Sequence, residues 1–330
     1  MHKAEHTVAM QPVFRVWSRP RQRYIALLVI SLSLFLVIPQ ISIFSQSLQL
    51  LKTVDFSKVL AAIFCLGLTF PLAASTYHLL ARRRLVYRRT LLVAVANMFT
   101  NRLLPAGTGS IATFFVYLRK RKHTVSQATS VVAVNNFMGF ISHAILLVGL
   151  LLFSPDNFAA FNIPRIQPTI FVMFMIGMVI IILIVFMRPV WRQRLILNTV
   201  SLRHNLLYYR RFPLRLSGAF ATSILLTVIN ALVLWFCVLA VGASISLLAA
   251  LLVFTIGMVV GTATPTPGGL GGTEAGLLAG LISYSISSET ALAAVVLYRL
   301  LSYWLTLGLG AVTYVYVERR GYLHRYEPQN

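Results

Sequence analysis

The sequence predicts an all-α integral membrane protein, with about six membrane-spanning helices and two broken, re-entrant hairpins arranged as an inverted repeat. Three observations support this fold class. Hydrophobic residues make up 58% of the 330-residue chain and charged residues only 11%, which is too few charges to cover a soluble domain of this size. Several apolar runs reach the ~20 residues that a membrane-crossing helix needs. The basic residues fall in blocks between those runs.

The predicted spans follow one another along a single membrane domain that covers residues 1–330. They are Tyr24–Phe44, Lys58–Leu80, Val125–Phe153, Pro168–Met187, Leu216–Val241 and Glu289–Val317. Residues 1–23 form a basic N-terminus, and no small-residue cleavage motif follows the first apolar run, so we expect an uncleaved first span. No polar stretch is long enough to form a separate catalytic domain.

The net charge of +22 has the distribution typical of a membrane protein. Most of the 29 lysines and arginines lie in blocks that flank the spans, and such blocks mark the cytoplasmic side of a membrane protein. We therefore expect a multi-pass protein of the cell membrane with both termini in the cytoplasm. This distribution argues against nucleic-acid binding.

The segment Thr90–Leu118 has basic blocks at both ends, so it must enter and leave the membrane on the cytoplasmic side. Its apolar sequence is interrupted at residues 101–110, "NRLLPAGTGS". Each arm has about 13 to 15 residues, roughly 20 Å of helix, which is shorter than the ~30 Å hydrocarbon core. A re-entrant hairpin fits this segment better than two crossings.

A second break, at residues 264–273, interrupts the apolar segment Ile245–Ile286. Here the charges allow either a re-entrant hairpin or two full crossings. The hairpin makes residues 216–317 a second repeat, opposite in orientation to a first repeat at residues 58–153. The breaks read "PAGTG" and "PGGLG". Paired breaks in inverted repeats indicate a transporter site near the midplane, whereas the alternative is that proline and glycine only kink packed helices.

Residues 188–211 connect the two repeats and alternate basic residues with apolar and aromatic ones. This pattern predicts an amphipathic helix on the inner leaflet, whose anionic lipids attract arginine. The alternative interpretation is an ordinary basic linker in the cytoplasm.

Charged residues inside apolar sequence are the first candidates for a binding site. An ionisable group inside the membrane costs roughly 2.5–3.5 kcal/mol and usually faces a partner. Glu274 is the only charge in Ile245–Ile286, and Arg102 and Arg299 are cations embedded in apolar sequence. We expect Glu274 either to pair with Arg299 or to cap a helix start, and an anionic ligand to compete with Glu274 for the arginine.

Glycines and amides complete the predicted substrate-binding set. The glycines at 268–272 precede a predicted helix start, whose free N–H groups favour an anion, although close helix packing also explains them. The asparagines lie within apolar spans, where amides either line a polar path or join helices. The set comprises Asn97, Asn101, Arg102, Asn135, Asn136, Gly268, Gly269, Gly271, Gly272, Glu274, Tyr298 and Arg299.

The second break also carries a resemblance to a known family. Residues 265–275, "PTPGGLGGTEA", followed by Tyr298 and Arg299, resemble the flippase-like transmembrane domain of lysylphosphatidylglycerol synthases and its stand-alone relatives. Many members have Gly-Glu after the first proline and Glu-Arg on the next helix. Here those regions read "GTG" at 107–109 and "NN" at 135–136, so roles that depend on those charges do not carry over.

The resemblance implies lipid handling: translocation between leaflets of an anionic or aminoacylated phospholipid, or of a polyprenyl-phosphate-linked lipid. The soluble domain that adds lysine in the synthases has no counterpart in this sequence, so the chain resembles the translocating part alone. A non-transporting membrane partner of a glycosyltransferase or lipid synthase is the alternative function. A small-solute or ion transporter is favoured less.

The sequence predicts no enzyme activity, metal site or cofactor. One buried carboxylate without a second acid, a nucleophilic dyad or a metal set offers little for catalysis. Cys65 and Cys237 lie in apolar spans without metal-binding spacing and are expected to be small buried side chains. Membrane lipids are the expected partners, while a lipid synthase or glycosyltransferase partner and a homo-oligomer remain open.

Overall fold

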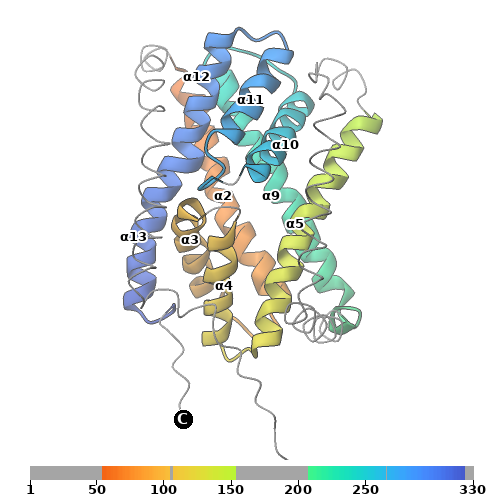
Figure 1. The fold of residues 1–330 in the computed structure, drawn as a ribbon, viewed down its shortest axis with the longest axis vertical. Helices are drawn as coiled ribbons and strands as arrows, with labels where there is room; N and C mark the ends of the chain where they lie inside the picture. Colours follow the sequence, from red (N-terminus) through yellow and green to blue (C-terminus); the bar gives the residue numbers. More distant parts are fainter. Residues whose placement is uncertain (1–53, 105–106, 154–206, 265, 324–330) are drawn as a thin grey trace, which may run out of the picture. The chain divides into compact units, whose positions relative to one another are not determined.

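The computed structural model describes residues 54–104, 107–264 without 154–206, and 266–323. All of them belong to the larger of the two units into which the chain divides, Gln46–Asn330. These residues form α-helices with one π-helical segment and contain no β-strand (Figure 1), which confirms the all-helical prediction for this part of the chain. The predicted spans at 24–44 and 168–187, the N-terminus at 1–23 and most of the predicted surface helix at 188–211 lie outside the described residues.

Four helices in the described part are long and apolar enough to cross a membrane. They are α2 (Phe56–Leu80), α5 (Val125–Phe153), α9 (Pro213–Ala240), and a continuous helix made of α12 (Ser288–Arg299), η3 (Leu300–Leu305) and α13 (Thr306–Arg319). The 25 residues of α2 extend over about 38 Å, more than the ~30 Å hydrocarbon core. Four of the predicted spans are therefore present, with ends within a few residues of those expected.

Two pairs of shorter helices form where the sequence predicts broken segments. Helices α3 (Tyr87–Leu103) and α4 (Thr108–Lys120) pack together, and so do α10 (Leu247–Ala263) and α11 (Gly272–Ser283). The longest of the four helices have 17 residues, about 26 Å, which is less than the ~30 Å core. The breaks between them fall within residues 101–110 and 264–273, as predicted.

Basic loops meet at one end of the helices. The N–H of Arg83, in the loop after α2, donates to Nε2 of His123, in the turn after α4, at 3.3 Å. The hydroxyl of Tyr209, just before α9, donates to the carbonyl of Leu80 at 2.7 Å. Burial of the ring lowers the pKa of His123, so the imidazole stays neutral and accepts the hydrogen bond that joins the two loops.

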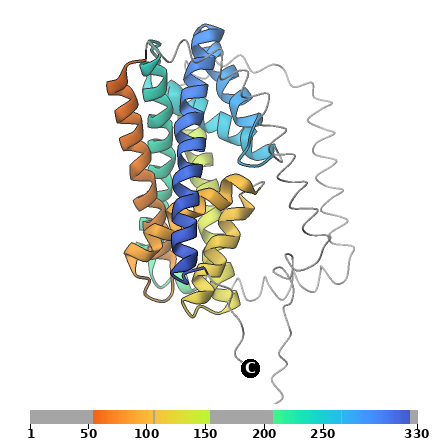
Figure 2. The same ribbon diagram turned by 90° about the vertical axis from the view of Figure 1, so that its left-hand side faces the viewer.

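The opposite end joins the start of α2 to the end of α9. The N–H of Asp55 donates to the carbonyl of Ala240 at 2.9 Å, and the Asp55 carboxylate accepts the N–H of Ser57, which caps α2. Nε1 of Trp235 donates to the carbonyl of Ile245, just before α10, at 2.9 Å. The α3–α4 hairpin thus starts and ends at the basic end, whereas the α10–α11 hairpin starts and ends here (Figure 2).

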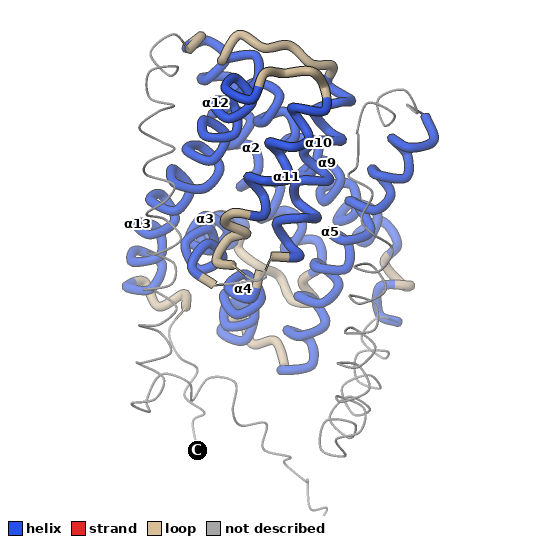
Figure 3. Tube along the Cα trace, turned by 45° about the horizontal axis from the view of Figure 1, so that its top comes forward, coloured by secondary structure: helices blue, strands red, loops and turns tan. Residues whose placement is uncertain are grey.

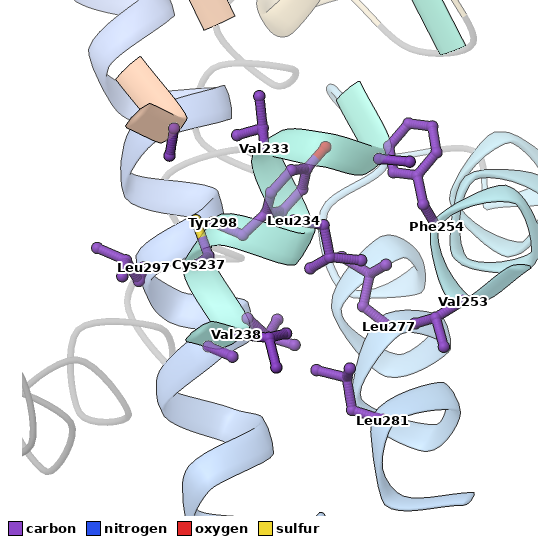
Figure 4. Close-up of a cluster of buried hydrophobic side chains, with 14 of the residues drawn as sticks. Val233, Leu234, Cys237, Val238, Val253, Phe254, Leu277, Leu281, Leu297 and Tyr298 are labelled. Atoms are coloured by element: carbon purple, nitrogen blue, oxygen red, sulfur yellow. The ribbon is translucent and has the colours of Figure 1, made fainter. Parts of the chain in front are cut away.

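Each hairpin is packed into its own buried apolar cluster. In the first, Tyr77 of α2 stacks on Phe114 of α4 with ring centroids 3.4 Å apart. In the second, side chains of α9 meet α10, α11 and α12 (Figure 4). Cys65 and Cys237 are free and buried, which confirms their prediction as small core residues.

Glycines bring α10 and α11 into direct backbone contact. A methyl group added at Gly276 would lie 2.9 Å from Cα of Gly257, and one added at Gly261 would overlap the side chain of Thr273. Such close approach is how small residues pack helices in membranes, where no hydrophobic force drives helices together. The close contact of α10 with α11 therefore depends on these glycines.

We expect Gly276→Ala to destabilise the protein by about 1–3 kcal/mol, because the new methyl group has no room against Gly257. Gly308→Ala is the matched control: it lies in α13 with nothing within 4 Å of the added methyl group, so it should be neutral or gain up to about 1 kcal/mol in helix propensity. Thermal unfolding of both variants in the same detergent tests this. Equal stability of the two variants would contradict close packing at Gly276.

Candidate functional site

The break between α10 and α11 lies directly against the end of α3. Gly268, in this break, has a φ of +59°, and a Cβ at this position would lie 2.5 Å from Cε2 of Tyr303 and 3.4 Å from Cδ of Arg102. Glycine is suited to this position because it adopts a left-handed conformation and leaves room for both neighbours. The two helix breaks, far apart in sequence, are thus next to each other (Figure 3).

Glu274 both caps a helix and forms an ion pair. Helix α11 begins at Gly272, where the sequence predicts a helix start. One carboxylate oxygen of Glu274, Oε2, accepts the N–H of Gly271 at 2.8 Å, and the other, Oε1, lies 2.6 Å from Nε of Arg299. The two alternatives for Glu274 therefore hold together, and a negative charge in the first turn also suits the helix dipole.

The two arginines have different partners. Arg299 is only 5% exposed, and beyond Glu274 its Nη2 lies 3.5 Å from the carbonyl of Gly268. Arg102 reaches from α3 to the π-helical turn, where its Nη2 donates to the carbonyl of Ser302 at 2.8 Å. Its Nε is buried without a hydrogen-bond partner, and no described carboxylate lies within salt-bridge distance of it.

Tyr303 joins the two arginines. The guanidinium carbons of Arg102 and Arg299 lie 5.5 and 5.1 Å from the centroid of its ring, and its hydroxyl donates to the carbonyl of Arg102 at 3.4 Å. A desolvated cation over an aromatic ring gains up to about 2 kcal/mol. The sequence prediction missed Tyr303, although its position four residues after Arg299 places it on the same helix face. Its turn, η3, is π-helical, a geometry frequent at functional sites.

The asparagines act mainly between helices. Nδ2 of Asn97 donates to Oγ of Ser110 at 3.2 Å, which joins α3 to α4. Nδ2 of Asn135 donates to the hydroxyl of Tyr77 at 3.1 Å, which joins α5 to α2. The Oδ1 atoms of Asn97 and Asn101 are buried without a hydrogen-bond partner, so these two amides retain acceptors for a further donor.

Two predicted site residues have other surroundings: one is exposed, and the other is packed in the hydrophobic core. Asn136 is exposed on α5, because consecutive helix positions point about 100° apart and its neighbour Asn135 faces inward. Tyr298 is 3% exposed and lies in the hydrophobic core beside Leu234 and Cys237 of α9 (Figure 4).

The cluster of Arg102, Glu274, Arg299 and Tyr303 combines two guanidinium groups with one carboxylate. One positive charge is therefore in excess among the described residues that form it. Gly269 and Gly271 hold the adjoining turn in left-handed conformations. Chemically, this arrangement suits an anion that guanidinium groups recognise through hydrogen bonds, such as a phosphate. Within the described residues, no group of His, Cys, Asp and Glu side chains could hold a metal ion.

The fold and the cluster define a class: a helical membrane protein in which two interrupted hairpins place buried charges between its halves. Within this class, the chain belongs to the family of the lysylphosphatidylglycerol synthase TM region, whose family model matches residues 24–310. The resemblance carried by the second break is thereby confirmed over most of the chain. The family relates this membrane protein to lipid synthesis or flipping. No individual curated protein matches the sequence significantly.

We expect Arg299→Ala to lower the free energy of unfolding by about 3–5 kcal/mol, because it removes the ion-pair partner of the partly buried Glu274 carboxylate. The double variant Glu274→Gln/Arg299→Ala should recover part of that loss, since it leaves no unpaired carboxylate at position 274. Arg84→Ala, in an exposed loop position, is the control and should change stability little. Unfolding of the purified variants in detergent measures this cycle, and a double variant as unstable as Arg299→Ala would rule out coupling between the two charges.

Proposed function

We propose that this protein translocates a phosphate-bearing lipid between leaflets: an anionic or aminoacylated phospholipid, or a polyprenyl-phosphate-linked lipid. The observation that carries the proposal is the pair of buried arginines, Arg102 and Arg299, over the ring of Tyr303 at the meeting point of two helix breaks. Buried cations in a membrane protein are costly and mark substrate paths. A phosphate is the group that all the proposed lipids share.

The proposed architecture is an inverted repeat with two re-entrant hairpins. Hairpins α3–α4 and α10–α11 are too short for full crossings, and they start from opposite ends of the longer helices. Residues 58–153 and 216–317 then form the two repeats. In transporters of this design, one repeat moves against the other around a site near the midplane. Arg102 and Arg299 belong to different repeats, so such a motion would separate them and release a bound phosphate.

Glu274 holds Arg299 in place when no lipid is bound. Their contact uses Nε of the guanidinium, which leaves the terminal Nη groups to donate to phosphate oxygens. The nearest contact of an Nη group, with the carbonyl of Gly268, is long at 3.5 Å and therefore weak. A lipid phosphate thus competes with Glu274 for the arginine, and protonation of the carboxylate would couple transport to protons.

Reconstitution into vesicles with fluorescently labelled phosphatidylglycerol tests the function. We expect the protein to raise the fraction of label that a membrane-impermeant reductant reaches, because inner-leaflet lipid moves outward. Arg102→Gln should slow this movement by roughly tenfold or more, the effect of losing one charged hydrogen bond to the substrate. Glu274→Gln should stay folded and change the rate or its pH dependence.

Glu289→Gln is the matched control for Glu274→Gln. Glu289 is exposed in the first turn of α12, so this substitution removes the same negative charge outside the cluster. Normal transport by Arg102→Gln and Glu274→Gln would mean that the cluster is only structural. Movement that appears only with a co-expressed glycosyltransferase or lipid synthase would favour the alternative, a non-transporting partner of such an enzyme.

We further propose that the basic end lies in the cytoplasm, together with both termini, in the cell membrane. Cysteines introduced at Gly242 and Ser287, at the end away from the basic loops, should react with an impermeant maleimide added to intact cells. Cysteines at Lys122 and Arg320 should react only after the cells are opened. The background variant replaces Cys65 and Cys237 by serine. Labelling of Lys122→Cys in intact cells would contradict the proposal and place the basic end outside.

A further inference from the structure

The ion cluster has an unmatched positive charge that no other described acid neutralises. The remaining described carboxylates are at helix ends: Asp55 caps α2, Glu289 lies in the first turn of α12, and Glu318 lies near the end of α13. Arg102 is in contact with a carbonyl and an aromatic ring instead of a carboxylate. The cluster as a whole therefore carries one positive charge when it is empty.

Burial makes this charge count important for a ligand. The side chains of Arg299 and Glu274 are 6% and 19% exposed, and Nε of Arg102 is fully buried. Charges interact far more strongly in such surroundings than in water. A ligand with one negative charge neutralises the cluster and is favoured. A ligand with two negative charges leaves one of them unmatched beside the carboxylate of Glu274, and this repulsion disfavours its binding.

Phosphate groups on lipids differ in this respect. A phosphodiester carries one negative charge. A phosphomonoester carries about 1.5 to 2 negative charges near neutral pH, because its second pKa is about 6. The cluster therefore matches the diester, whereas a cluster of two arginines without Glu274 would match the dianionic monoester.

We propose that Glu274 is a specificity-determining residue: by cancelling one of the two arginine charges, it makes the site select phosphodiesters over phosphomonoesters. The inference rests on the proposed function, since it takes the ligand to be a lipid phosphate. It narrows the substrates to lipids whose phosphate bears a second ester, such as phosphatidylglycerol or a polyprenyl phosphate joined to a sugar. Phosphatidic acid and free polyprenyl phosphate are disfavoured.

Two short-chain lipids test the charge rule directly. Dihexanoyl phosphatidic acid and dihexanoyl phosphatidylmethanol differ by one methyl group and, at about pH 8, by one negative charge. Binding to the purified full-length protein in a neutral detergent is measured by calorimetry. We expect the wild type to bind phosphatidylmethanol roughly tenfold more tightly than phosphatidic acid, since burial amplifies a difference of one charge.

Two variants test whether the preference for phosphatidylmethanol depends on the charge of Glu274. Glu274→Gln should favour phosphatidic acid, because two arginines then face the ligand without a carboxylate. Glu289→Gln removes the same charge outside the cluster and should keep the wild-type ratio. Equal binding of the two lipids by the wild type, or an unchanged ratio in folded Glu274→Gln, would overturn the proposal.

A second variant keeps the proposal testable if Glu274→Gln does not fold. Arg102→Gln retains the Glu274–Arg299 pair and the cap of α11, and it reduces the net charge of the cluster to zero. It should bind phosphatidylmethanol roughly tenfold more weakly than the wild type does, because the cluster then has no net positive charge for the diester to neutralise. Unchanged binding of phosphatidylmethanol by this variant would also overturn the charge rule.

A soluble diester and a transport assay separate this inference from the proposed function. Glycerophosphoglycerol has the diester but no acyl chains, so binding weaker than that of phosphatidylmethanol supports a lipid ligand, and equal binding overturns the lipid assignment. Lipid movement without any diester preference overturns the charge rule alone. A clear diester preference without lipid movement in vesicles supports the charge rule and overturns the translocation function.

Discussion

The buried guanidinium of Arg299 is the constraint on which the arrangement of this site depends. A charge at this depth needs acceptors, and both come from the α10–α11 hairpin: the carboxylate of Glu274 at 2.6 Å and, more distantly, the carbonyl of Gly268. Because breaking a buried pair costs about 3–5 kcal/mol, the pair holds α11 and the break before it against α12. The close glycine packing of α10 on α11 allows this short hairpin to fit there.

The same cluster also supplies hydrogen-bond partners for backbone N–H and C=O groups at the helix breaks. Polar backbone groups inside a membrane must find partners within the protein. Glu274 accepts the N–H of Gly271, Arg102 donates to the carbonyl of Ser302, and the hydroxyl of Tyr303 donates to the carbonyl of Arg102. The cluster therefore stabilises broken helices and retains one positive charge. That remaining charge connects the fold to the proposed handling of a phosphate.

The two halves contribute unequally to the site. The second half supplies Glu274, Arg299 and Tyr303, whereas the first supplies Arg102 and the neighbouring acceptors of Asn97 and Asn101. Arg102 makes three contacts with the second half at this point. Its guanidinium donates to the carbonyl of Ser302, its backbone carbonyl accepts a long hydrogen bond from Tyr303, and its guanidinium lies over the Tyr303 ring. Contacts of this kind exchange readily for phosphate oxygens, as the proposed motion of one repeat against the other requires.

Local sequence determined the membrane class, both helix breaks and the family, because apolar length, basic blocks and Pro-Gly breaks are readable along the chain. It also determined the Glu274–Arg299 pair, since so few ionisable residues lie in apolar sequence that few partners were available. Only the tertiary structure decided which neighbours face the site. Asn135 and Asn136 are equivalent in sequence, yet helix phase turns only Asn135 towards a partner, the hydroxyl of Tyr77. Tyr303 is not marked in the sequence as a neighbour of Arg102, yet the fold places both guanidinium groups close to its ring. The hydrogen bonds of Arg102 with Ser302 and Tyr303 join residues some 200 positions apart, and nothing in a single local stretch encodes them.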